Sequence, residues 1–133
     1  MTQFSPYLNF AGQAAEACAF YGEIFRAEPK IMLFGENSMG ANPEHVMHAQ
    51  ITVAGGTMLM LSDSGMTRAA DGTDAVQVGI TGEDLAEGKR IAEALAEGGT
   101  TIMPMEVQMW GDAYGQVRDK FGIVWHINIA QPR

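Results

Sequence analysis

The chain has 133 residues, 47% of them hydrophobic, and a formal net charge of -8 at pH 7. This length is sufficient for one domain, residues 1–133, with a hydrophobic core of its own. The acidic balance argues against nucleic-acid binding, and no apolar run is long enough to span a membrane. Cys18 is the only cysteine and the N-terminus lacks a secretory signal pattern, so we expect a cytoplasmic protein without disulfides.

The first half of the chain predicts a strand, a helix and three further strands. Alternating apolar residues indicate strands, and apolar residues at helical spacing indicate the helix, which Arg26 and Pro29 bring to an end. Ala54-Gly55-Gly56 is typical of a hairpin turn. The predicted elements are strand 5–10, helix 12–25, strand 30–34, a loop at 35–44, and strands 47–53 and 57–62.

The same order of elements recurs in the second half. Thr81 followed by Asp84 matches a capping box, which predicts that a helix starts at Thr81, and Gly98-Gly99 ends it. Pro104 predicts that the next strand lies at a sheet edge or is bulged. The predicted elements are strand 75–81, helix 81–97, and strands 100–108, 114–119 and 123–129.

Each half therefore reads as a βαβββ module, with module one at about 1–63, a linker at 64–73 and module two at about 74–133. Neither module can bury its sheet alone, so we expect the two to pair. The predicted architecture is α+β, with a curved mixed sheet around a cleft and the helices outside.

The last strand separates apolar from polar side chains most clearly. Ile123, Trp125, Ile127 and Ile129 share one face, whereas His126 and its neighbours Val124 and Asn128 share the other. A strand of this kind is typical of a boundary between a core and a pocket.

Several motifs together resemble the PhnB-like branch of the vicinal oxygen chelate superfamily, which has the glyoxalase/bleomycin-resistance fold. They are SPYLNF, FYGEIF, HAQITVAGG followed by LMLSD, EGKR, and W-G-D-x-Y-G followed by DKFGIVWHIN. The resemblance covers essentially the whole chain and implies paired βαβββ modules, a U-shaped sheet around a cleft and usually a homodimer. It does not imply one activity, because members of the superfamily isomerise, lyse, oxygenate, transfer thiols or sequester drugs.

The resemblance also implies four positions for metal ligands, one on the first and one on the last strand of each module. These positions fall on Ser5, Met60, Ala75 and His126. Ser, Met and Ala are poor ligands for divalent ions, which prefer imidazole and carboxylate groups. We therefore predict no native metal and no cofactor.

The cleft face is expected to hold a small molecule of unknown identity. His48 and His126 titrate near neutrality and are candidates for general acid or base, although either could be hydrogen-bonded within a packed sheet. Trp110 and Tyr114 could stack on a planar ligand, or fill the cleft mouth or a dimer seam. The remaining candidate binding residues are Tyr7, Asn9, Gln50, Met58, Met60, Gln77 and Asn128.

Other reactive side chains receive structural interpretations. Asp63, Asp112 and Asp119 precede or lie in turns, where Asp commonly accepts hydrogen bonds from local backbone amides. Cys18 lies in an Ala-rich helix and is interpreted as a packed apolar residue.

The leading hypothesis is a metal-independent small-molecule binding protein, with its cleft completed by a second subunit of a homodimer. One alternative is a metal-free enzyme that uses His48 or His126 as general base. Another is a metal-dependent lyase, isomerase or dioxygenase whose ligands lie elsewhere or come from a partner chain. A structural or regulatory dimer without a ligand is the fourth.

Overall fold

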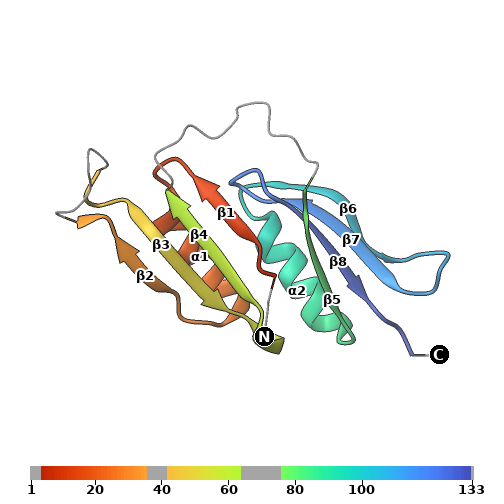
Figure 1. The fold of residues 1–133 in the computed structure, drawn as a ribbon. Helices are drawn as coiled ribbons and strands as arrows, with labels where there is room; N and C mark the ends of the chain where they lie inside the picture. Colours follow the sequence, from red (N-terminus) through yellow and green to blue (C-terminus); the bar gives the residue numbers. More distant parts are fainter. Residues whose placement is uncertain (1–3, 36–41, 64–75, 133) are drawn as a thin grey trace. The chain divides into compact units, whose positions relative to one another are not determined.

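The computed structural model describes residues 4–35, 42–63 and 76–132. The chain divides into two compact units, residues 1–70 and 71–133, each with a four-stranded mixed sheet and a 12-residue α-helix (Figure 1). Both units follow the order βαβββ, so the predicted α+β class is confirmed. No helix in the described parts of the chain is long and apolar enough to cross a membrane. The predicted linker at 64–73 lies outside the described residues.

The first unit has the strand order β1-β4-β3-β2, with β1 and β4 parallel and the other pairs antiparallel. The predicted turn at 54–56 is confirmed as a short 3-10 segment. Most of the predicted loop at 35–44 lies outside the described residues. The elements are β1 (Tyr7–Phe10), α1 (Ala14–Phe25), β2 (Lys30–Leu33), β3 (Val46–Thr52) and β4 (Met58–Asp63).

Helix α1 packs one apolar face on this sheet. Its buried side chains include Ala17, Tyr21 and Ile24, which recur at the spacing of one helical face. The helix ends where Arg26 adopts the left-handed conformation, with φ 54° and ψ 47°, as the sequence predicts. The following amide, Ala27 N, donates to Gly22 O at 3.0 Å and satisfies one of the last carbonyls.

Asp63 is buried at the end of β4 and connects three parts of the first unit. Its Oδ1 accepts hydrogen bonds from Gly12 N at 2.7 Å and Ala14 N at 3.0 Å, and its Oδ2 accepts from Val46 N at 3.0 Å. The structural interpretation of Asp63 is therefore confirmed. The expectation of local backbone partners is wrong, because tertiary packing brings distant amides to this carboxylate.

The second unit has the strand order β5-β8-β7-β6, again with one parallel pair, β5 and β8. Strand β6 lies at the sheet edge, and its register shifts between Thr101 and Met103 and between Met103 and Glu106. The edge or bulge predicted from Pro104 is thus confirmed. The elements are β5 (Val78–Gly82), α2 (Leu85–Ala96), β6 (Thr100–Val107), β7 (Ala113–Arg118) and β8 (Val124–Ile129).

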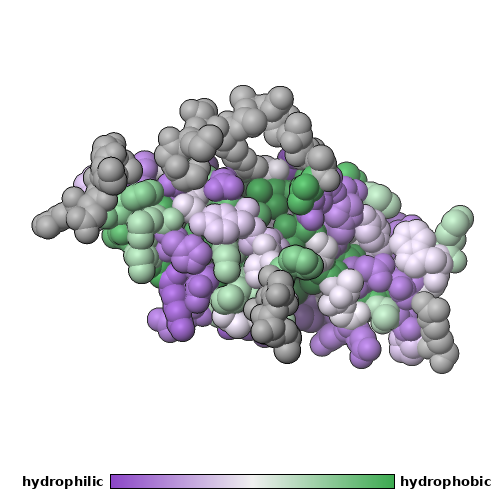
Figure 2. All heavy atoms as spheres, viewed as in Figure 1, coloured by the Kyte–Doolittle hydropathy of each residue, from purple (hydrophilic) through white to green (hydrophobic). Residues whose placement is uncertain are grey.

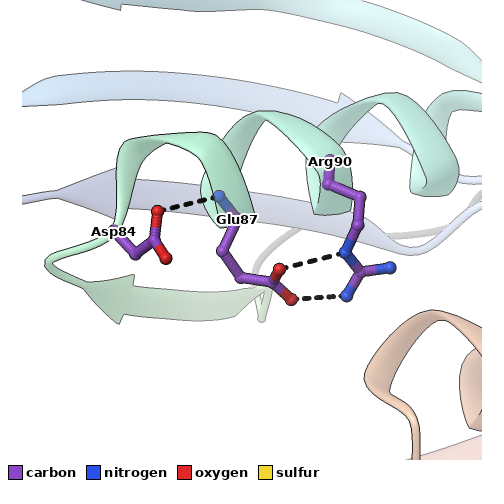
Figure 3. Close-up of polar contacts among 3 residues, drawn as sticks. All are labelled: Asp84, Glu87 and Arg90. Atoms are coloured by element: carbon purple, nitrogen blue, oxygen red, sulfur yellow. Dashed lines mark hydrogen bonds and ion pairs between the residues drawn. The ribbon is translucent and has the colours of Figure 1, made fainter.

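The predicted start of the second helix at Thr81 is wrong. Thr81 continues strand β5, where a β-branched side chain is favoured, and Asp84 is the N-cap of α2. The Asp84 carboxylate accepts from Glu87 N at 3.2 Å, and Glu87 in turn accepts two hydrogen bonds from Arg90 (Figure 3). The cap orients the first turn, whereas the partly exposed Glu87–Arg90 ion pair adds little stability.

Asp119 holds the turn between β7 and β8. Its Oδ1 accepts from Phe121 N at 2.9 Å and Ile123 N at 3.0 Å, and its Oδ2 accepts from the indole Nε1 of Trp125 at 2.9 Å. Gly122 in this turn has φ 89°, a conformation that favours glycine. The structural interpretation of Asp119 is confirmed, with local partners as expected.

Candidate functional site

Each sheet has an open face, which is the face turned away from the helix of its own unit. In the second unit, burial alternates along β7: Ala113, Gly115 and Val117 are buried, and the intervening side chains are half-buried. Along β8 the same alternation runs from Trp125 to Ile129, whereas Val124, on the open face, is also buried. The open face of the second unit comprises Gln77, Thr81, Tyr114, Gln116, Arg118, His126 and Asn128.

His126 lies at the centre of this open face. Its Nδ1 contacts the hydroxyl of Tyr114, and its Nε2 contacts Oε1 of Gln77. Because a carboxamide oxygen only accepts, this placement of Gln77 assigns the ring proton to Nε2, and Tyr114 then donates to Nδ1. The rings of Tyr114 and His126 also stack, with centroids 5.8 Å apart and planes 30° apart. Both ring nitrogens are engaged.

Trp110 extends this row of rings. Its centroid is 5.8 Å from that of Tyr114, with the planes at 63°, and half of its surface is exposed. Its Nε1 lies 3.4 Å from Oδ1 of Asn128, in position to donate to it, and Nδ2 of Asn128 donates to Oδ2 of Asp112 at 3.1 Å. Trp110, Tyr114 and His126 are hereafter called the aromatic row.

Two residues of this region were not predicted as site residues. Asp112, interpreted from sequence as structural, contacts Asn128 and so belongs to the polar cluster beside Trp110. Gln116 is half-buried on the open face, and its carboxamide has no hydrogen-bond partner among the described residues. The sequence could have identified Gln116 as a site residue, because it lies two residues from Tyr114 and therefore on the same strand face.

The open face of the first unit carries the other predicted residues. The hydroxyl of Tyr7 lies 3.3 Å from Nδ1 of His48, and their ring centroids are 5.9 Å apart. Met60 pairs with Tyr7 on β1 and with Gln50 on β3, so it lies between them. Asn9 is exposed on the same face as Tyr7. Within the described residues, Nε2 of His48 has no hydrogen-bond partner.

The donor set does not fit the metal of the superfamily. The parallel pairs Tyr7–Met60 and Gly79–His126 occupy matching positions, so Ser5, two residues before Tyr7, corresponds to Gln77. The first unit thus offers a hydroxyl and a thioether, and the second an imidazole and an amide, with no carboxylate. No three His, Cys, Asp or Glu side chains among the described residues are grouped to hold a metal ion. The predicted ligand position at Ala75 is therefore wrong, because the parallel register of β5 with β8 places it at Gln77. Ala75 itself lies outside the described residues, and the absence of a native metal stays a prediction.

Cys18 fits its interpretation as a packed apolar residue. It is fully buried in α1, and burial, with a smaller contribution from the charge of Asp63, raises its pKa from 9.0 to about 11. A thiol of this kind is protonated and a poor nucleophile.

The two βαβββ units, with their polar open faces, define a protein of the glyoxalase/bleomycin-resistance fold. The model of the 3-demethylubiquinone-9 3-methyltransferase family matches residues 2–128, and the chain belongs to this PhnB-like family. The resemblance inferred from the sequence motifs is thereby confirmed.

Known relatives support this assignment along the whole chain. Protein YjdN of Escherichia coli (strain K12) is 30% identical over 141 residues, which cover 96% of this chain and 95% of YjdN. The PhnB protein of Bacillus cereus is 29% identical with a TM-score of 0.83, over 97% of this chain and 100% of that chain. Protein PA1353 of Pseudomonas aeruginosa is 30% identical with a TM-score of 0.87, over 99% of this chain and 100% of that chain.

A glyoxylase/bleomycin resistance protein/dioxygenase domain from Frankia sp. EAN1pec shares the fold. It is 18% identical with a TM-score of 0.68, over 98% of this chain and 93% of that chain.

Proposed function

We propose that the open face of the second unit binds a small planar molecule and does so without a native metal. The observation that carries this proposal is the aromatic row, whose polar atoms are held by Gln77 and Asn128. Aromatic faces stack favourably on planar ligands. Side chains that are already oriented lose little conformational entropy on binding, which favours affinity.

The binding proposal is tested with carbostyril, a bicyclic lactam, measured by equilibrium dialysis. We expect saturable binding that weakens about tenfold in Tyr114→Leu, because the stacking surface is lost. The fluorescence of Trp110 reports where carbostyril binds, since it should be quenched while that of the buried Trp125 is not. The variant Trp110→Phe shows the Trp125 fluorescence alone. If carbostyril does not bind, or binds equally well to Tyr114→Leu and Trp110→Phe, the proposal is overturned and a structural dimer without a ligand is favoured. The family description names a demethylated ubiquinone, so benzoquinol is a second planar probe.

The metal-free part of the proposal has a separate test. Metal content of the purified protein is measured, followed by calorimetric titration with zinc, nickel, manganese and ferrous ions. We expect weak surface binding that His126→Ala leaves unchanged. Stoichiometric metal that is lost in His126→Ala would overturn this part and favour a metal-dependent lyase, isomerase or dioxygenase.

A second candidate function is metal-free acid–base chemistry at His48. Its Nε2 is available within the described residues, while Nδ1 faces the Tyr7 hydroxyl at 3.3 Å. A general base needs a free lone pair within reach of the proton that it removes. His126 meets this need less well, because Gln77 or Tyr114 must first be displaced. Turnover of any substrate should then be lost in His48→Ala, and an enzyme based on His126 would lose turnover in His126→Ala instead.

We also propose that the protein is a homodimer that uses the edge strand β2. Ile31, Met32 and Leu33 are 45%, 56% and 48% exposed, and apolar side chains lie at the surface over this strand (Figure 2). An exposed apolar edge strand is a template for pairing with another chain. Sedimentation should give a dimer for the natural sequence and a monomer for Met32→Lys; an unchanged dimer would remove β2 from the interface.

A cytoplasmic location is the last part of the proposal. The lone Cys18 is buried and cannot form a disulfide within the chain, which suits a reducing compartment. Fractionation of cells that express the full chain tests this, and a periplasmic or secreted product would contradict it.

A further inference from the structure

The open face of the second unit contains one polar side chain whose role the aromatic row does not explain. Gln116 on β7 pairs with His126 on β8 and with Met103 on β6, so it lies in the middle of the sheet. Its side chain is half-buried, and its carboxamide has no hydrogen-bond partner among the described residues. A carboxamide offers two donors and two acceptor sites, which are costly to leave unused away from water.

The neighbouring polar groups are engaged, in contrast to Gln116. Gln77, His126 and Tyr114 contact one another, and Asn128 is held between Trp110 and Asp112. The guanidinium of Arg118 donates to the carbonyl oxygen of Gly122 at 3.2 Å. The charged groups Arg118 and Asp112 therefore already have partners, which disfavours recognition of the ligand by its charge.

We propose that Gln116 determines ligand specificity by pairing with an uncharged planar ring that carries a hydrogen-bond donor and an acceptor on adjacent atoms. Lactams and amino-substituted nitrogen heterocycles have such an edge, and carboxamide side chains pair with it through two parallel hydrogen bonds. Tyr114 and Gln116 lie two residues apart on one strand face, about 7 Å along the strand. A fused ring can therefore contact Tyr114 at one end and present its polar edge to Gln116 at the other, with Met103 beside it. The inference deepens the proposed function and rests on it.

The position is repeated in the first unit, which supports a role in recognition. Gln50 pairs with Met60 as Gln116 pairs with His126, and it too is half-buried without a partner among the described residues. Because the aromatic row lies in the second unit, we place the ring-binding site beside Gln116 and not beside Gln50.

The test compares carbostyril with two close analogues by equilibrium dialysis. N-methylcarbostyril keeps the ring and the acceptor but lacks the donor, and quinoline lacks the lactam. We expect carbostyril to bind the natural sequence about tenfold more tightly than either analogue, as one or two well-formed hydrogen bonds allow. In Gln116→Met, which has similar volume but no amide, the three affinities should become equal. Gln13→Met, the same substitution at an exposed position at the start of α1, should keep the tenfold difference.

The outcomes separate this inference from the function on which it rests. If all three compounds bind equally to the natural sequence and Gln116→Met changes nothing, Gln116 is merely hydrated and the inference is overturned, while planar binding stands. If none binds, the proposed function itself fails. If the difference is lost in Gln13→Met as well, the effect is not specific to Gln116 and the inference is again overturned. Thermal unfolding of each variant checks that the fold is retained.

Discussion

The open faces of the two units have the same strand register but different side chains at matching positions. In the first unit His48 keeps one ring nitrogen without a partner among the described residues, and Met60 lies on the same open face. In the second unit both nitrogens of His126 are engaged. The matching pairs are Tyr7 and Gly79, Met60 and His126, His48 and Tyr114, and Gln50 and Gln116.

The register of a strand decides where a side chain points, whereas the chemistry of the side chain decides what the surface can do. Among the described residues, the first face presents an imidazole nitrogen without a partner and the second presents ordered rings. Each face also has one half-buried carboxamide without a partner there, Gln50 and Gln116.

Removal of the Asp63 carboxylate should break the first unit. Asp63→Ala leaves three backbone amides without this acceptor, two in buried and one in a part-buried hydrogen bond, so we expect the free energy of unfolding to fall by about 4 kcal/mol. Urea denaturation measures the change. Asp84→Ala is the control, because loss of that exposed N-cap should cost only about 1 kcal/mol. Equal losses in the two variants would contradict the anchoring role of Asp63.

Close packing of α2 on β8 distinguishes the second unit. Gly88 is the fourth residue of α2, and the matching fourth residue of α1 is Ala17. In α2 there is no room for an alanine, because a Cβ at Gly88 would lie 2.5 Å from Cγ1 of Ile129. Gly88→Ala should therefore destabilise the protein by about 2 kcal/mol through overpacking. Gly79→Ala, which meets nothing within 4 Å, should be almost neutral. Thermal unfolding of both variants is the measurement; a stable Gly88→Ala would mean that α2 shifts without cost.

Cys18 gives the first unit a distinct response to alkaline pH. The folded-state pKa of the Cys18 thiol, about 11, lies above the ordinary value of 9.0. The contribution of the buried, protonated thiol to the free energy of unfolding is therefore fully present below pH 9.0 and is lost as pH rises through about 11. The loss should reach about 2 kcal/mol. Urea denaturation across this range should show a steeper decline for the natural sequence than for Cys18→Ala. Parallel declines would show that the thiol does not titrate differently on unfolding.

Exchange of one matching residue tests whether His126 orders the aromatic row. His126→Met places in the second unit the side chain found at the matching position of the first. It removes the imidazole contacts of the Tyr114 hydroxyl and of Oε1 of Gln77. We expect carbostyril binding to weaken several-fold, with stability reduced by about 1 kcal/mol. Met60→Gln is the matched control on the other open face. Unchanged binding in His126→Met would show that Tyr114 needs no support from the imidazole.

Local patterns in the sequence predicted most of the secondary structure. Alternation identified the strands, although their ends differ by up to three residues, and Pro104 correctly marked an edge strand. The start of α2 was misplaced because Thr81 and Asp84 are both acceptable N-caps, and only the pairing of β5 with β8 commits Thr81 to the sheet.

Local periodicity in the sequence was enough to predict the α+β class, the repeated βαβββ order and the face on which most candidate residues lie. The contacts of those residues follow from the tertiary structure. Gln77 meets His126 because two strands distant in sequence pair in parallel, and Asp63 collects amides from α1 and β3 for the same kind of reason. That the Gln116 amide has no partner among the described residues became visible only in the folded structure, since hydrogen bonding between distant segments leaves no local signal in a sequence.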